Sequence, residues 1–311
     1  MMKFEHIPVL LKESIDFLSP KPDGIYIDAT LGGGGHSLEI LKRTKGKAKL
    51  IGIDWDEDAV ETAKKRIREA VIIRDNFANL KSILNSLKIK FVDGVIFDLG
   101  LSSYQIETGE RGFSLRKDGP LDMRMDKRLK ITASDLVNKL DSDKLKKIIK
   151  NYGEERFAGR IANALVKARK SKPIDRTLEL KRIIEKALPP SSPKRKLDSV
   201  TRVFQALRIA VNSELDNLKH ALDDSIDILK KHGRIVVISY HSLEDRIVKQ
   251  KLRLEAKDCI CPPKTPRCVC GHKKKLKILT KKPIQPTRTE IESNPRGRSA
   301  KLRAGERVYP S

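Results

Sequence analysis

The first third of the chain alternates short apolar runs with stretches of helical periodicity. The apolar runs lie at Gly24–Asp28, Leu50–Asp54, Val71–Ile73 and Val92–Phe97, and helical patterns separate them. Strands separated by helices need crossover connections, and these place the strands parallel in one sheet. The pattern therefore predicts a doubly wound α/β domain.

The alternation stops after residue 100. Residues 101–130 have the glycine content of a loop, and residues 132–229 repeat apolar side chains at helical spacing, with one long helix expected over about 200–231. Gly153 and Gly233 are expected to end helices.

The chain then returns to strand-like patterns. Gly233–Ser239 is a buried-strand candidate, and two late segments, Leu276–Ile284 and Lys301–Val308, are candidates for an antiparallel pair. The predicted architecture is a doubly wound α/β sheet with an inserted all-helical domain. We expect a discontinuous sheet domain over residues 1–107 and 214–311, and a basic helical insertion over residues 108–213.

Charge separates these regions. The net charge is +25, divided as −1 over residues 1–110, +15 over 111–213 and +11 over 214–311. A near-neutral front and a basic remainder predict one part for a small ligand and another for a polyanion. The alternative, the lysine enrichment of hyperthermophile proteins, would raise Lys and Glu together along the whole chain. No apolar run reaches the ~18 residues of a membrane span, and acidic residues interrupt the N-terminal segment. We therefore expect a cytoplasmic protein with no membrane partner.

A glycine-rich loop directly follows the first predicted strand. Asp28 is followed by Ala-Thr-Leu and four glycines, and Asp54 ends the next strand. Consecutive glycines let the backbone turn tightly against a ligand, and an acidic residue about 20 positions further on suits a ribose. The pattern favours a nucleoside-type cofactor, either a dinucleotide or S-adenosylmethionine. Phe77 offers an aromatic face for adenine, although its alternative is a core side chain. Asp98 offers a polar group near the reacting atoms.

Blocks of sequence along nearly the whole chain resemble one family, the bacterial 16S ribosomal RNA cytosine-N4 methyltransferases of the MraW or RsmH type. The blocks are HIPVLLKE (6–13), IDATLGGGGHS (27–37), IGIDWD (51–56), FDLGLSSYQ (97–105), RGFSLRKDGPLDMRMD (111–126), FQALRIAVNSEL (204–215), HGRIVVISYHSLEDR (232–246) and NPRGRSAKLRAGER (294–307).

The resemblance implies an α/β fold with a class I (Rossmann-like) methyltransferase sheet and an inserted all-helical domain. It also implies transfer of a methyl group from S-adenosylmethionine to the exocyclic N4 of a cytosine of 16S ribosomal RNA within the small subunit, and no DNA substrate. It implies a cofactor pocket lined by the glycine loop and by residues that follow the second, third and fourth strands: Gly34, Gly35, His36, Asp54, Phe77, Asp98 and Gln105.

The transferred methyl goes to an exocyclic amine whose lone pair is delocalised into the ring. The enzyme must therefore align the amine and accept its proton. Asp98, Ser102 and Ser103 are the candidate acceptors after the fourth strand, and His241 is a further candidate at the end of the returning strand. The alternative for His241 is a loop histidine with a satisfied hydrogen bond.

All four cysteines lie within twelve residues, as Cys259, Cys261, Cys268 and Cys270. Clustered thiols in a cytoplasmic protein favour metal binding over disulfides, so a structural zinc ion is a candidate. The Cys-x-Cys spacing is tighter than the usual Cys-x₂-Cys of zinc sites. The alternative is a reduced, cysteine-rich surface loop.

Three other functions compete with an RNA methyltransferase. An RNA chaperone with a vestigial cofactor site would have no need of Asp54 and Asp98. A nicotinamide dehydrogenase would bind a dinucleotide. A DNA amino-methyltransferase would carry an Asp/Asn-Pro-Pro-Tyr type of motif after the fourth strand, where Asp98-Leu-Gly-Leu stands.

Overall fold

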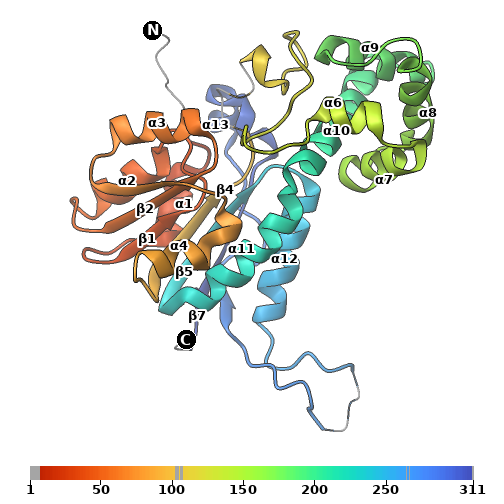
Figure 1. Ribbon diagram of the computed structural model, residues 1–311. Coiled ribbons are helices and arrows are strands. Elements are labelled where there is room, and N and C mark those ends of the chain that lie inside the picture. The colour runs from red at the N-terminus through yellow and green to blue at the C-terminus, as the bar shows by residue number, and fades with distance from the viewer. Residues whose placement is uncertain (1–7, 102–104, 106–107, 264, 266, 310–311) are drawn as a thin grey trace. The chain divides into compact units, whose positions relative to one another are not determined.

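A computed structural model describes residues 8–101, 105, 108–263, 265 and 267–309 of the 311-residue chain. The chain divides into two compact units. Residues 1–100 and 215–311 form the sheet unit, and residues 101–214 form the helical unit (Figure 1).

The sheet unit is built on seven strands in the order β3-β2-β1-β4-β5-β7-β6. The first five pair in parallel, and β7 runs antiparallel to both β5 and β6. This sheet confirms the predicted class of fold, including the late antiparallel pair. The strands are β1 (Ile25–Asp28), β2 (Lys49–Asp54), β3 (Ala70–Arg74), β4 (Val92–Asp98), β5 (Leu229–Ser239), β6 (Leu276–Ile278) and β7 (Lys301–Arg307).

Helices cover both faces of this sheet, as the crossover connections require. One face packs against α1, α2 and α3, and the other against α4, α11 and α12. The helices and short 3₁₀ turns of this unit are α1 (Leu11–Leu18), α2 (Gly35–Arg43), α3 (Glu57–Arg66), η1 (Phe77–Asn79), α4 (Leu80–Ser86), α11 (Glu214–Ile228), α12 (Ser242–Glu255), α13 (Arg288–Ser293) and η3 (Pro295–Ser299).

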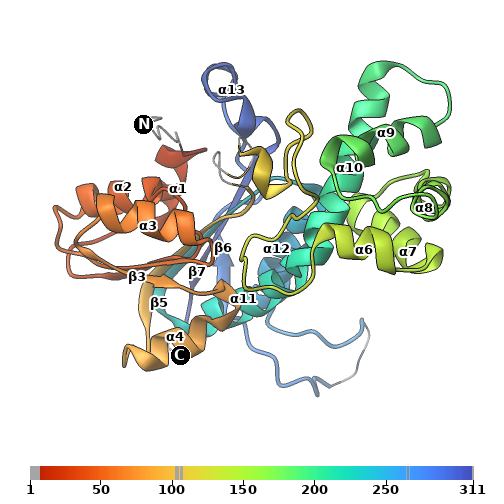
Figure 2. The same cartoon turned by 45° about the horizontal axis from the view of Figure 1, so that its top comes forward.

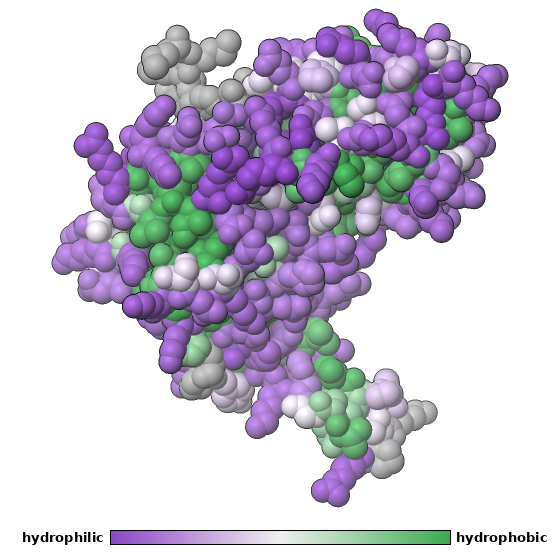
Figure 3. Space-filling model, viewed as in Figure 1, coloured by the Kyte–Doolittle hydropathy of each residue, from purple (hydrophilic) through white to green (hydrophobic). Residues whose placement is uncertain are grey.

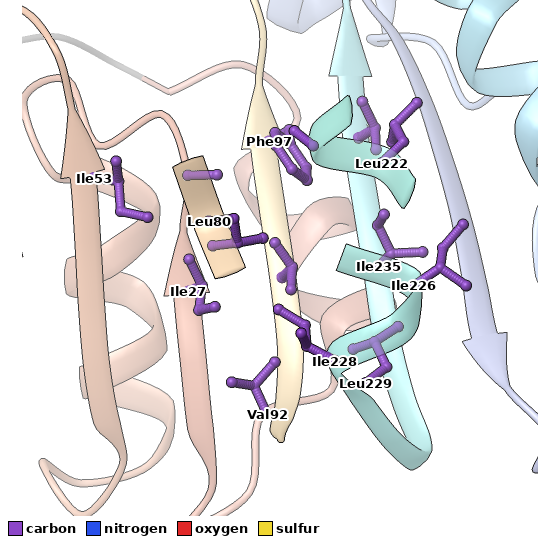
Figure 4. Packing of buried hydrophobic residues seen from close by; sticks show 14 of the residues in the cluster. Ile27, Ile53, Leu80, Val92, Phe97, Leu222, Ile226, Ile228, Leu229 and Ile235 are labelled. Atoms are coloured by element: carbon purple, nitrogen blue, oxygen red, sulfur yellow. The ribbon is translucent and has the colours of Figure 1, made fainter. Parts of the chain in front are cut away.

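Alternate residues of each central strand supply the two cores. Phe97 of β4 faces the α4 and α11 side, whereas the preceding Ile96 faces the α1 and α2 side. In Figure 4, Leu80 of α4 and Leu222 of α11 lie on either side of Phe97, and Ile235 lies near Ile226 of α11. These side chains are fully buried, and burial of each stabilises the fold by about 1.5–3 kcal/mol. The two cores together hold the carboxyl ends of β1, β2 and β4 in fixed positions.

The helical unit contains α6 (Ala133–Lys139), α7 (Ser142–Gly153), α8 (Ala158–Ala168), α9 (Thr177–Ala187) and α10 (Pro193–Asn212), preceded by η2 (Gly109–Arg111) (Figure 2). Its core consists of the apolar faces of these helices. The preceding loop is held by polar contacts: Asp122 accepts two hydrogen bonds from the guanidinium of Arg124, at 2.7 and 2.8 Å. None of the helices in the described ranges is long and apolar enough to cross a membrane.

The prediction of one long helix over about 200–231 is wrong. The helix breaks at Ser213, which has a φ of 51° and donates its N–H to the carbonyl of Ile209. The next helix, α11, ends at Ile228, and β5 begins at Leu229, so Gly233 lies within a strand instead of ending a helix. A single left-handed residue hardly shifts the apolar periodicity, so the pattern passes through the break. Gly153, by contrast, is the last residue of α7, as predicted.

Candidate cofactor site at the carboxyl ends of the strands

The strand order reverses at β1, which lies between β2 and β4. Ligands of open α/β sheets bind outside the carboxyl ends of the strands at such a reversal. Three neighbouring strands end there in an aspartate: Asp28 on β1, Asp54 on β2 and Asp98 on β4. The register of the sheet therefore gathers three carboxylates at one edge.

The glycine loop turns between β1 and α2. Gly32 and Gly34 have φ values of 48° and 77°, which residues other than glycine rarely adopt. A Cβ on Gly34 would also lie 2.4 Å from Cδ1 of Ile67. Gly34 is the N-cap of α2, and no side chain caps that helix. The N–H groups of its first turn and the bare backbone of the loop suit the carboxylate end of an amino acid.

Asp54 joins this loop to the second strand. Its Oδ2 accepts the N–H of Gly32 at 2.8 Å, and its Oδ1 accepts the N–H of Asp56 at 2.9 Å. An ionised carboxylate has about four lone-pair positions, so each oxygen keeps capacity for a hydroxyl of a ribose. Burial raises the pKa of Asp54 to about 6.

Asp98 is held by side chains from three other segments. Tyr240, directly after β5, donates its hydroxyl to Oδ1 of Asp98 at 2.7 Å. The backbone N–H of Asp98 donates to Oγ1 of Thr30 at 2.6 Å. Nδ1 of His36, in the first turn of α2, lies 3.8 Å from Oδ2. Asp98 is thus fixed in orientation, and its side chain is 15% exposed.

The three aspartates carry unfavourable negative charge. Burial raises the pKa of Asp28 to about 6 and that of Asp98 to about 7. The charge of Asp28 adds to the rise at both Asp54 and Asp98. A pyrophosphate would increase this repulsion, whereas a cation would relieve it. Of the two cofactors that the sequence left open, these carboxylates favour the cationic S-adenosylmethionine over a dinucleotide.

Phe77 lies in η1 after β3. Its ring packs edge-on against Phe97, with centroids 5.7 Å apart, and lies 6.3 Å from Trp55 at a tilt. Phe77 is only partly buried, so it is both a core contact and an exposed aromatic surface. Its predicted role beside adenine remains a prediction.

Four further residues were predicted to belong to the site. Ser102 and Ser103 lie outside the described residues. Gln105 is buried and belongs to the helical unit, and its role toward the cofactor remains a prediction. His241 is the N-cap of α12: its Nδ1 accepts the N–H of Glu244 at 3.4 Å. This contact agrees with the structural alternative, and a part in proton transfer remains a prediction.

Sequence reasoning missed Tyr240, Thr30 and Ser37 as parts of this site. Ser37 donates its hydroxyl to Oδ2 of Asp28 at 2.7 Å. The available signal was position, since Thr30 and Tyr240 each lie one or two residues beyond the end of a strand. The pairing of β4 with both β1 and β5 brings them to Asp98, and that pairing is not visible in a local pattern.

The family model described as the MraW methylase family matches residues 3–308. The chain belongs to the MraW methylase family. This result confirms the resemblance seen in the sequence blocks and makes the chain a methylase-family enzyme.

Curated relatives agree with the family assignment. A protein of Halothermothrix orenii is 54% identical over 98% of this chain and 99% of its own length, and one of Caldicellulosiruptor saccharolyticus is 52% identical over 98% and 100%. Both are named ribosomal RNA small subunit methyltransferase H. A solved structure titled as a putative rRNA-methylase from Clostridium thermocellum covers 97% of this chain and 100% of its own, at 12% identity and a TM-score of 0.47; this similarity is too low to bear on the assignment.

Proposed function

We propose that this protein transfers the methyl group of S-adenosylmethionine to the exocyclic N4 of one cytosine in 16S ribosomal RNA, within the small ribosomal subunit. The observation that carries the proposal is the group of three aspartates beside a glycine loop, which suits a cationic methyl donor. Membership of the MraW methylase family and the names of the relatives support the ribosomal RNA substrate.

The residues proposed to hold the cofactor follow successive strands of the sheet. Asp54 accepts the ribose hydroxyls, and Phe77 flanks the adenine. The methionine end lies against Gly34, Gly35 and His36. Asp98 and Gln105 close the pocket beside the sulfonium. When bound, S-adenosylmethionine supplies an electrophilic methyl group on a positively charged sulfur.

The chain's own task is to make a poor nucleophile react. The N4 lone pair is shared with the cytosine ring, so an acceptor placed against the N4–H bonds helps electron density to return to nitrogen. Asp98 is proposed as this acceptor, and the hydroxyl of Tyr240, which donates to one of its oxygens at 2.7 Å, holds the carboxylate in a fixed orientation. Ser102, Ser103 and His241 are retained as further candidates for hydrogen bonding or proton transfer.

The helical unit is proposed to hold the RNA. Residues 111–213 carry a net charge of +15, and phosphate contacts supply much of the affinity for nucleic acid. A base in a helix must leave its stack before a buried group can reach N4, so grip on the flanking RNA is needed. With this substrate, we expect the protein to act in the cytoplasm.

Labelled S-adenosylmethionine tests the proposal against its rivals. The protein is incubated separately with 16S RNA, small subunits from unmethylated cells and double-stranded DNA, and nucleosides are then resolved by mass spectrometry. We expect N4-methylcytidine at one position in the small subunit and no label in DNA. Methylated DNA, or RNA binding with no transfer to any substrate, would contradict it. Preferential binding of a dinucleotide would favour the dehydrogenase.

A further inference from the structure

The segment between α12 and β6 forms a closed extension of the sheet unit. The N–H of Lys275 donates to the carbonyl of Glu255 at 2.8 Å, so the chain leaves and returns at one point. Residues 256–263, 265 and 267–275 contain no helix or strand. Figure 1 shows this extension below α12, and hydrophobic colour gathers on its surface in Figure 3. Val269 is 82% exposed and Ile260 43%, so these apolar side chains form no core that could order the extension.

The four cysteines converge within this extension. Their Sγ atoms all lie within 4.8 Å of one another. Sγ of Cys268 is 3.5 Å from that of Cys259, 3.6 Å from that of Cys270 and 3.9 Å from that of Cys261. The Cys259 to Cys270 separation is 3.7 Å. Two arms of the extension, each with a Cys-x-Cys pair, therefore bring their thiols to one point.

These separations match one metal ion. Four sulfurs at about 2.3 Å from a tetrahedral zinc ion lie about 3.8 Å from one another. A disulfide would need about 2.05 Å, and all four cysteines are free. An iron–sulfur cluster places inorganic sulfide between the thiolates and needs wider spacing.

Backbone N–H groups point at the same sulfurs. Cys261 donates to Sγ of Cys259 at 3.4 Å, and Val269 donates to Sγ of Cys261 at 3.4 Å. The N–H of Ile260 donates across the two arms to Sγ of Cys270 at 3.5 Å. Hydrogen bonds to sulfur favour the thiolate, which is the form that binds metal.

We propose that Cys259, Cys261, Cys268 and Cys270 bind one Zn²⁺ as four thiolates. Binding forms four Zn–S bonds and releases the four thiol protons to solvent, with no change in oxidation state. Four protein ligands fill the tetrahedron and leave no position for water or substrate, so the ion is structural. It joins the two arms of a segment that has no core, and the extension is ordered only when the ion is bound.

Metal analysis of the full chain tests the site directly. Protein without a histidine tag is purified under reducing conditions and analysed by mass spectrometry for metals. We expect about one zinc per chain, released by a mercurial reagent that blocks thiolates. The double variant Cys268→Ser with Cys270→Ser should lose at least about nine-tenths of that zinc. The matched control, Val269→Ser between them, should keep it.

A second measurement does not depend on the variants folding. Cobalt added to the metal-free wild-type chain should give thiolate charge-transfer bands and the visible bands of a tetrahedral site. Zinc should also slow tryptic cleavage at Arg267 and Lys273 and leave the melting of the sheet unit little changed. Protein that takes up neither zinc nor cobalt, holds iron instead, or carries two disulfides from a reducing cytoplasm would overturn the proposal.

Discussion

The strand ends of the sheet unit carry buried negative charge, whereas the start of α10 in the helical unit carries exposed positive charge. At the strand ends, three aspartates are gathered in surroundings that disfavour their ionised forms. At the start of α10, Lys194 and Arg195 are exposed. Concentrated buried charge selects a small cation, whereas spread surface charge suits a long polyanion. The comparison predicts that the two functions can be damaged separately.

Within the helical unit, basic residues divide into two kinds. Arg202 donates to Glu155 at 2.8 Å, and Arg208 makes two hydrogen bonds of 2.8 Å with Glu214. These two arginines are committed to internal ion pairs, so they belong to the structure of the unit more than to its basic surface. The cluster Lys194–Lys196 is the better candidate for contact with phosphate.

The largest expected effect is at Asp98. Asp98→Asn keeps the shape but removes the anionic acceptor, so kcat/KM for methyl transfer should fall by about 10²–10³-fold. Steady-state kinetics with small subunits measures the loss. Asp93→Asn, at the other end of β4, is the matched control and should keep most of the activity. Full activity of Asp98→Asn would remove Asp98 from the proposed chemistry.

Asp54→Ala should act on cofactor affinity. Loss of charge-assisted hydrogen bonds to the ribose should weaken binding of S-adenosylmethionine by about 1.5–3 kcal/mol, with the fold and RNA affinity kept. Calorimetric titration of the folded variant checks this value. An unchanged affinity for S-adenosylmethionine would show that Asp54 does not hold the ribose of the cofactor.

Neutralising Lys194, Arg195 and Lys196 should weaken RNA binding without changing affinity for S-adenosylmethionine. Each lost phosphate contact should lower the log–log salt slope by about 0.7–0.9. Titrations at several salt concentrations measure the slope. A control variant in the sheet unit neutralises the exposed Lys42, Lys45 and Lys47. Its salt slope for RNA binding should stay closer to that of the wild type. Equal slopes for the α10 variant and wild type would move the search to Arg296–Arg307.

The smallest effect is on stability against pH. The folded-state pKa of Asp98, about 7, lies above its ordinary 3.8, so the folded chain binds this proton more tightly than the unfolded chain does. The contribution to stability is present at acid pH and is lost as pH rises through about 7. Melting temperatures without cofactor should therefore fall less between pH 5.5 and 8 for Asp98→Asn than for wild type. An equal fall in melting temperature for the two proteins would show that the pKa of Asp98 is not raised in the folded chain.

The fold and the cofactor edge were largely predictable from local patterns. Apolar runs with intervening helices specify parallel strands, and Asp54 and Asp98 are recognisable because each ends a strand. Tyr240 was not predictable as a partner of Asp98, since that contact depends on the pairing of β4 with β5. The break at Ser213 was missed because one left-handed residue leaves no mark in the periodicity.

The pairing of β4 with β5 also has a consequence for how the chain folds. Val95 pairs with Ile235, so the centre of the sheet closes only after the intervening residues have been brought round. Loop-closure entropy for a flexible segment of this length costs about 4 kcal/mol, and contacts so distant in sequence slow folding. The helical unit is one continuous segment. If it folds first, it shortens the loop to be closed, and so acts as an internal guide for the assembly of the sheet.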